Sequence, residues 1–332
     1  MAYRRTCYKT VRLLMKRPLV NQNIKPGIAA IFTLGWVQIL SWGGSFYLMA
    51  VMANPIAAET GWSQQWIYGA LSTGILVSGL LSPLAGRIIA RTGGRLLLAL
   101  SGVVMAVGLV IMAYSVTLPL FLFAWVIIGI GMAMGLYDAL FATLGTCYGG
   151  KARSAITSIT LISGFCTTLV WPGTALLIHG FGWRDATLII AAMMVVCVLP
   201  AYLFAIPANH AKQPVKRRSR EPASAEIEPA LFWLLCAIFT LASVIMTAIS
   251  VQLIALLQAT GHTLTSALAI SAVMGPCQVG SRLVDIAFKR SHPIRTTFFS
   301  VGLVAAGLLL LAIFPQMAIL SLVLYGAGNG LR

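Results

Sequence analysis

One acidic residue, Asp138, stands inside a long apolar run, residues 118–146. An ionisable side chain inside a membrane span costs about 2.5–3.5 kcal/mol on insertion scales, so it is a functional candidate by default. Asp138 lies about 20 residues into the run, close to its far end at about 1.5 Å per residue. It either pairs with Arg91 or Arg95 of a preceding basic segment, acts as a protonatable group or counter-ion in a cavity, or is an incidental interfacial charge.

Uncharged polar residues form a second group of candidates. Gln38, Gln252 and Gln278 each lie inside an apolar run. An unsatisfied amide in lipid is costly, so we expect each to form a hydrogen bond between helices or to contact a bound solute. Weaker candidates, for which ordinary helix packing is the alternative, are Trp42, Tyr137, Trp171 and Asn329.

The sequence lacks the motifs of most catalytic chemistry. It has no Gly-x-x-x-x-Gly-Lys-Ser/Thr loop, which argues against an ATP-driven pump, and neither His-Glu-x-x-His nor Cys-x-x-Cys. Its four His residues are scattered in loops and at the ends of apolar runs, so no metal site is predicted. We therefore expect no cofactor and no enzyme, with an intramembrane enzyme as a distant alternative.

Long apolar runs must position these residues. Of 332 residues, 59% are hydrophobic and 9% are charged, whereas a soluble domain carries about 25% charged residues. Lipid is therefore the expected solvent, and each run of about 20 apolar residues should cross it as a helix. Ten such runs are predicted, at about 28–52, 65–85, 95–115, 118–146, 154–178, 185–206, 229–257, 265–284, 296–314 and 317–332.

The basic residues predict the orientation of these spans. One side of the membrane would hold every one of the 23 Lys and Arg residues except Arg184 and Arg332. By the positive-inside rule that side is cytoplasmic, so we predict a multi-pass protein of the inner (plasma) membrane with a cytoplasmic N-terminus. The same bias explains the net charge of +16, so no nucleic-acid partner is expected.

A polar segment divides the chain. We predict a basic tail at 1–26, a six-helix unit at 27–206, a cytoplasmic linker at 207–228 and a partial second unit of about four helices at 229–332. Similar sequences recur at offsets of 195 residues (Gly86 to Ser281) and 197 residues (Gly129 to Gly326). The second unit is therefore expected to repeat the first.

At this point the chain resembles the major facilitator superfamily of secondary transporters. The loop after the second span carries the family's glycine and arginine signature at Gly86, Arg91, Gly93 and Arg95, and Arg87 is a further basic residue there. The signature acid is replaced by Ala90, and the second half has Arg282 and Asp285 at the corresponding place. A span-four Arg found in many proton-coupled members is replaced by Trp125, which leaves the coupling ion open.

The resemblance implies an all-α integral membrane protein with two parallel-repeat six-helix bundles, of which about ten of twelve helices are present. It implies that the signature residues, with Asp138, act at a cytoplasmic gate. The loop arginines are simple membrane anchors in the alternative. The implied function is transport of a small organic solute by alternating access, with H⁺ or Na⁺ as coupling ion and lipid as a further partner. The alternative is a truncated, non-transporting membrane protein, either a fragment or an assembly partner.

Overall fold

The computed structural model describes residues 27–207, 229–287 and 293–331. These residues form helices joined by short connections, and the described segments contain no strand. The predicted tail 1–26 and nearly all of the predicted linker 207–228 lie outside the described residues. The prediction of an all-α protein is confirmed.

The N-terminal half is a chain of helices with two short irregular segments, the 3-10 turn Gly149–Lys151 and the π-helical segment Met194–Val198. Its α-helices are α2 (Ile28–Gly43), α3 (Met49–Thr60), α4 (Gln64–Thr92), α5 (Arg95–Ala113), α6 (Leu118–Gly135), α7 (Tyr137–Tyr148), α8 (Ala152–Ser163), α9 (Cys166–Met193) and α10 (Leu199–Ala205). Helix α9 contains a sharp turn at Gly182, whose φ of 79° suits glycine.

In the C-terminal half, the described residues form five α-helices and the 3-10 turn Pro315–Met317. They are α11 (Pro229–Ala259), α12 (Leu264–Ala272), α13 (Met274–Ala287), α14 (Pro293–Ile313) and α15 (Ala318–Gly330). The N-terminal part of α11 exposes Phe232, Trp233 and Leu234, whereas its C-terminal part buries Leu253 and Leu257.

The predicted apolar runs are all helical, but four of them are broken part-way. The breaks fall at residues 44–48, at Leu136, at Gly164 and Phe165, and at Val273. Six helical stretches of the described chain are long and apolar enough to cross a membrane by length and composition, and the longest, residues 118–205, contains three predicted runs. Breaks in a membrane span are tolerated where protein or a cavity meets the freed backbone.

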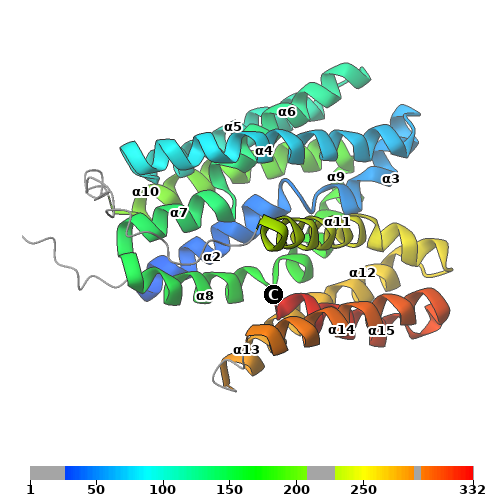
Figure 1. Ribbon diagram of the computed structural model, residues 1–332. Helices are drawn as coiled ribbons and strands as arrows, with labels where there is room; N and C mark the ends of the chain where they lie inside the picture. Colours follow the sequence, from blue (N-terminus) through cyan, green and yellow to red (C-terminus); the bar gives the residue numbers. More distant parts are fainter. Residues whose placement is uncertain (1–26, 208–228, 288–292, 332) are drawn as a thin grey trace, which may run out of the picture.

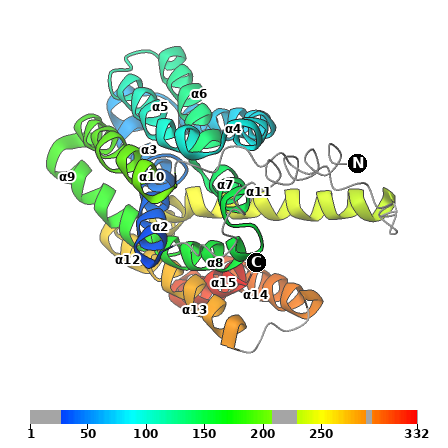
Figure 2. The same cartoon turned by 90° about the vertical axis from the view of Figure 1, so that its left-hand side faces the viewer.

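Figure 1 shows the two halves as two groups of helices whose axes run in broadly the same direction. Figure 2 shows α12 to α15 together on one side of α11 and the group of α4, α5 and α6 on the other. The halves meet where α3 packs against α11 and where α9 packs against α12 and α13.

Glycine allows the closest helix contacts within the N-terminal half. A Cβ on Gly129 of α6 would lie 2.5 Å from the carbonyl oxygen of Gly74 in α4. The adjacent Trp125 is fully buried, and a Cβ on Gly74 would lie 2.9 Å from its ring. Small residues bring membrane helices together because lipid provides no hydrophobic drive between them. Trp125 is therefore a packing residue in this fold.

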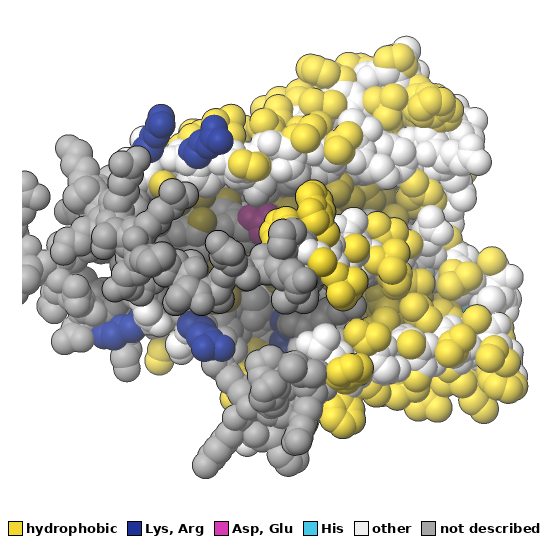
Figure 3. All heavy atoms as spheres, viewed as in Figure 1, with side chains coloured by type: hydrophobic (Ala, Val, Ile, Leu, Met, Phe, Trp, Pro, Cys, Tyr) yellow, Lys and Arg dark blue, Asp and Glu magenta, His cyan; other side chains and the backbone are white. Residues whose placement is uncertain are grey.

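The two ends of the helices differ in charge. Arg87 and Arg91 lie exposed near the end of α4, Lys151 lies between α7 and α8, and Arg153 lies in the first turn of α8. We call this the basic end. On the face in view, Figure 3 shows Lys and Arg side chains toward this end and many hydrophobic side chains toward the other end. The other end, where α3 and α11 finish, is called the opposite end below.

Candidate functional site

The broken helices meet at a cavity of about 1130 Å³ between the two halves. Residues at or near three of the four breaks contribute to its wall, namely Trp42 and Tyr47, Tyr137, and Gly164 and Cys166. Gln278 of α13, five residues after the fourth break, lines it as well. The wall continues to Arg153 and Asp285, so the cavity extends toward the basic end. The breaks therefore bring polar backbone and side chains to one place inside an apolar fold.

The break at Leu136 is stabilised by a buried hydrogen-bond network. Leu136 is extended, with ψ of −172°, and this ends α6 at Gly135. Gln38 Nε2 donates to the Gly135 carbonyl oxygen at 2.9 Å and to the Tyr202 hydroxyl oxygen at 2.8 Å. The Tyr202 hydroxyl donates to the same carbonyl at 3.1 Å. An unpaired carbonyl here would be costly, so Gln38 and Tyr202 make the break possible.

The same network positions an aromatic wall. Trp42 Nε1 donates to Gln38 Oε1 at 3.1 Å. The Trp42 ring lies 5.0 Å from the ring of Tyr137 and 6.0 Å from that of Tyr47, between ring centroids. Trp42 and Tyr137 line the cavity, as predicted candidates for solute contact, and Tyr47 lines it as well. The wall offers apolar faces of the kind that bind small molecules.

Polar residues of α8 and the start of α9 form a second wall. Arg153, Thr157, Thr160, Ser163 and Thr167 recur every three or four residues and all line the cavity. This spacing places them on one helical face. Ser163 also forms a 2.6 Å hydrogen bond with the Tyr137 hydroxyl. The sequence-based candidates missed this stripe, although its i, i+3 and i+4 spacing is visible in the sequence.

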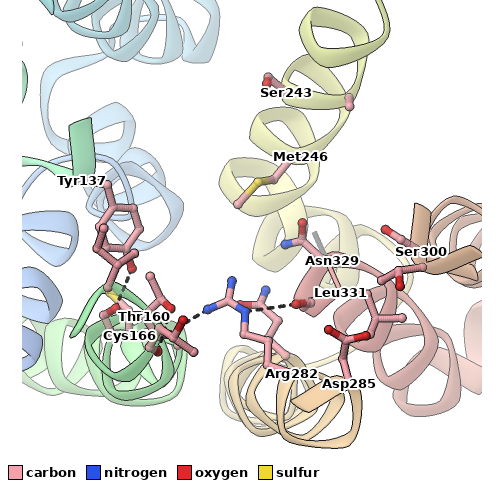
Figure 4. A pocket seen from close by; sticks show the side chains of 18 of the residues that line it. Tyr137, Thr160, Cys166, Ser243, Met246, Arg282, Asp285, Ser300, Asn329 and Leu331 are labelled. Carbon is pink, nitrogen blue, oxygen red and sulfur yellow. Dashed lines mark hydrogen bonds between the residues drawn. The ribbon is translucent and has the colours of Figure 1, made fainter. Parts of the chain in front are cut away.

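The third wall belongs to the C-terminal half and is centred on Arg282 (Figure 4). Arg282 Nη1 donates to the Thr160 carbonyl oxygen at 2.9 Å, and its Nε donates to the Gly330 carbonyl oxygen at 3.0 Å. The first bond crosses to the N-terminal half and the second reaches the end of α15. Arg282 and Asp285 lie within α13, which extends beyond the predicted span 265–284.

Two amides accompany Arg282 in this wall. Gln278 and Asn329 both line the cavity and are each 7% exposed. Gln278 Nε2 is buried without a hydrogen-bond partner, and so is Thr167 Oγ1 on the facing helix. Buried polar groups are almost always paired, so each of these two atoms calls for an explanation.

Three predicted candidates lie away from this cavity. Gln38 is fully buried in the network described above. Trp171 is also fully buried, and its Nε1 donates to the Tyr47 carbonyl oxygen at 3.3 Å. Gln252 faces a second cavity of about 700 Å³ between α4 and α11, which Tyr68 and Ser72 also line. For Gln38 and Trp171 the structure thus shows bonds between helices.

The signature loop behaves as a helix connection. Gly93 ends α4 with φ of 84°, a conformation that glycine adopts freely. Arg95 Nε donates to the Leu203 carbonyl oxygen at 3.0 Å and thereby caps the end of α10. Arg87 and Arg91 are exposed, and Gly86 has open space around it.

Asp138 lies apart from the loop arginines. It is exposed, in the first turn of α7, directly after the break at Leu136. Gly94, next to Arg95, packs against Thr143, five residues further along α7. Asp138 is therefore about 7 Å deeper than this contact along the helix axis. Among the described residues the ion pair is Arg184 with Glu59, so neither Arg91 nor Arg95 is paired with Asp138 in this conformation.

At the opposite end, hydrogen bonds join the halves. Asn54 Nδ2 in α3 donates to Gln258 Oε1 in α11 at 3.2 Å, and Gln64 Nε2 donates to Asn54 Oδ1 at 2.8 Å. Closer to the cavity, Thr168 Oγ1 in α9 donates to the Ala272 carbonyl oxygen in α12 at 2.7 Å. These contacts close the interface between the halves on the far side of the cavity from the basic end.

A polar cluster also ties the N-terminal half together at this end. Arg184 Nε and Trp183 Nε1 donate to the two Glu59 carboxylate oxygens, at 2.7 and 2.6 Å. Arg184 also donates to the carbonyl oxygens of Ala113 and Ser115. The hydrogen bond from Arg184, together with that from Trp183, lowers the pKa of Glu59 below its usual value.

The cavity thus offers aromatic faces, hydroxyls, amides and a guanidinium. In the segments 27–207, 229–287 and 293–331, no group of three His, Cys, Asp or Glu residues could hold a metal ion. Such a wall can bind and orient a small solute without covalent chemistry.

Comparison with known proteins agrees with this arrangement. The family model described as Major Facilitator Superfamily matches residues 34–331. No curated protein matches the sequence significantly.

Solved structures share the fold at low sequence identity. A D-xylose-proton symporter is 14% identical with a TM-score of 0.65, over 92% of this chain and 80% of that one. The nucleoside transporter NupG is 16% identical with a TM-score of 0.64, over 91% and 79% of the two chains. The xylose transporter XylE from E. coli, in an inward open conformation, is 14% identical with a TM-score of 0.60, over 92% and 79%. Because the family model covers most of the chain, this multi-pass membrane protein belongs to the major facilitator superfamily of solute transporters.

Proposed function

We propose that this chain is a secondary active transporter that moves a small organic solute across the inner membrane by alternating access. The observation that carries the proposal is the cavity of about 1130 Å³ between the two halves. Alternating access in this family's fold needs a central site between two units that rock about it. The proposal assigns binding and movement to the cavity, and no catalysis.

The asymmetry of the interface supports an inward-facing state. The halves are joined at the opposite end by Asn54 with Gln258 and by Thr168 with Ala272, whereas the cavity wall reaches Arg153 and Asp285 at the basic end. We assign the basic end to the cytoplasm because lysine and arginine accumulate on that side of membrane proteins. The solute would then exchange with the cytoplasm in this conformation.

Cross-linking tests the alternation. In a background where the six native cysteines are serine, Asn54→Cys with Gln258→Cys should form a disulfide that holds the opposite end closed. Vesicles containing the oxidised protein should lose solute uptake, and a reductant should restore it. Each single cysteine variant is the control for oxidation itself. Unchanged uptake in the fully cross-linked protein would rule out alternating access through this interface.

Labelling tests the orientation. A cysteine at Ser219, in the predicted linker and outside the described residues, should resist a membrane-impermeant reagent applied to intact cells. A cysteine at Thr60, near the end of α3, should react. The reverse pattern would place the basic end outside and would refute the predicted cytoplasmic N-terminus.

The transported solute and the driving ion are open to a screen in vesicles. Uptake and efflux should be measured with an imposed proton gradient and, separately, a sodium gradient. We propose that Asp138 acts either at the cytoplasmic gate or as the group that couples transport to the proton gradient. It lies exposed beside the break at Leu136 and has no ion-pair partner among the described residues. Asp138→Asn should leave binding nearly unchanged if it serves the gate. Loss of pH dependence with gating intact would assign it to proton coupling instead.

A further inference from the structure

We propose that the cavity binds an organic carboxylate, with its carboxylate group held by Arg282 and Gln278 and its apolar body against Trp42 and Tyr137. This inference rests on the proposed transport function, because it names the class of solute that the same cavity takes. It follows from hydrogen-bond donors that have no acceptor among the described residues.

Arg282 supplies charge and spare donors. A guanidinium has five N–H groups. In Arg282, Nε donates to the Gly330 carbonyl oxygen and Nη1 donates to the Thr160 carbonyl oxygen. These neutral carbonyl acceptors fix the plane of the group and leave its positive charge uncompensated by a direct ion pair in the described residues. The Nη2 end and the rest of the charge therefore remain available to a ligand.

Gln278 supplies a second donor at the same place. It lies four residues before Arg282 in α13, which places both side chains on one helical face. Gln278 lines the cavity, and its Nε2 is buried without an acceptor among the described residues. The facing Thr167 hydroxyl, 1% exposed, is also without a partner. An acceptor-rich group in the cavity would satisfy both of these donors together with Arg282.

The charges that face this position favour an anion. Arg282, Arg153 and Asp285 line the cavity, so two of these three charged side chains are basic. Asp285, one turn after Arg282, forms no ion pair with it in this conformation. A carboxylate has two oxygens that can accept from a guanidinium and a neighbouring amide together, which gives geometric selectivity as well as strength.

The opposite wall suits an apolar body. Trp42 and Tyr137 are 5.0 Å apart between ring centroids, and both line the cavity. The Trp42 N–H is already used by Gln38, and the Tyr137 hydroxyl is bonded to Ser163. These two rings therefore present mainly their carbon faces to a solute.

Benzoate and benzamide provide a matched pair of probes, because they share the ring and differ in the carboxylate. Binding to the purified full chain in lipid nanodiscs should be measured by titration calorimetry at neutral pH. D-xylose and inorganic phosphate should be measured in parallel as a neutral solute and as an anion without an apolar body. We expect benzoate to bind at least tenfold more tightly than each of the other three.

Variants of the same chain test the assignment. Arg282→Gln should remove the preference for benzoate over benzamide, and Arg282→Lys should keep the preference with weaker affinity. Gln278→Leu should weaken benzoate binding about tenfold, whereas Gln252→Leu, which changes the same residue type in the second cavity, should not. The melting temperature of each unliganded variant identifies any that fail to fold.

The outcomes separate this inference from the proposed function. Equal binding of benzoate and benzamide, tighter binding of phosphate, an unchanged preference in a folded Arg282→Gln variant, or no binding of benzoate would each overturn the carboxylate assignment. If the vesicle screen nevertheless finds a transported solute, the transport function stands without it. Conversely, if benzoate binding depends on Arg282 but no solute is transported, the result supports the carboxylate site and rejects the transport function.

Discussion

Two buried glutamines of this protein are bonded in opposite ways. Gln38 in α2 is fully buried and uses both ends of its amide, since Nε2 donates to Gly135 and Tyr202 and Oε1 accepts from Trp42. Gln278 in α13 is 7% exposed, and its Nε2 has no acceptor. The difference separates an amide that holds the fold together from one that is available to a ligand.

The contrast follows from the backbone around each residue. The break at Leu136 leaves the Gly135 carbonyl without its usual helical partner, and Gln38 supplies the missing donor. No such demand arises at Gln278, which faces the cavity from within α13. A saturated buried network should therefore control stability, whereas an orphaned donor should control binding.

The largest effect on stability is expected at the saturated amide. Gln38→Leu would leave the Trp42 N–H and part of the Gly135 and Tyr202 network unpaired, so the free energy of unfolding should fall by about 1–3 kcal/mol. Denaturant titration in micelles measures this change in the free energy of unfolding. Tyr202→Phe in the same experiment should be non-additive with Gln38→Leu, because the two groups share one network. Full additivity would show that the network is not a unit.

An intermediate effect is expected at the orphaned amide, and it should appear in binding. Gln278→Leu removes an unpaired buried donor, so the free energy of unfolding should change by less than about 1 kcal/mol and can increase. The affinity for benzoate should nevertheless fall about tenfold. A strong destabilisation with unchanged affinity would reverse the roles that we assign to the two glutamines.

The smallest effect on stability is expected at the surface cluster of Glu59, Trp183 and Arg184, whose hydrogen bonds are described above. Glu59 is 50% exposed, so its pair with Arg184 should contribute about 0–1 kcal/mol. The folded pKa of Glu59 is lowered, so this contribution is present above the unfolded pKa and is lost as the pH falls through the folded pKa. Glu59→Gln should therefore lower stability slightly at neutral pH and remove that part of the acid dependence.

Asp185 offers a control for this comparison. It is an acid one residue after Arg184, and it forms no ion pair among the described residues. Asp185→Asn should leave the stability profile between acid and neutral pH close to that of the unmodified protein. An equal shift for both variants would indicate a general effect of charge at this end.

The helices were predictable from the sequence, whereas their breaks were only partly so. Runs of about 20 apolar residues are a direct consequence of the thickness of the membrane, and each predicted run is helical. The pair Gly43-Gly44 signals the first break, and a Cβ on Gly44 would lie 2.4 Å from Met194. Leu136 carries no such signal, because its extended backbone depends on Gln38 and Tyr202 from distant parts of the chain.

The cavity was predictable in outline only. Trp42, Tyr137, Gln278 and Asn329 were candidates from their polarity and line it, but Gln38 and Gln252 were candidates for the same reason and lie elsewhere. Residue type cannot distinguish a satisfied amide from an unsatisfied one, since that depends on which carbonyl a break exposes. The stripe from Thr157 to Thr167 could have been found by its helical spacing.

The hydrogen bond from Arg282 to Thr160 couples the affinity for the solute to the conformation of the protein. Since it joins the two halves, a ligand that draws this guanidinium toward itself competes with a contact that favours one conformation. By thermodynamic reciprocity, the factor by which the ligand shifts the conformational equilibrium equals the factor by which the conformation changes the dissociation constant of the ligand. A tenfold factor corresponds to about 1.4 kcal/mol. A dissociation constant measured with the halves locked in a binding conformation should therefore differ from that of the free protein by the fraction of the free protein that occupies this conformation.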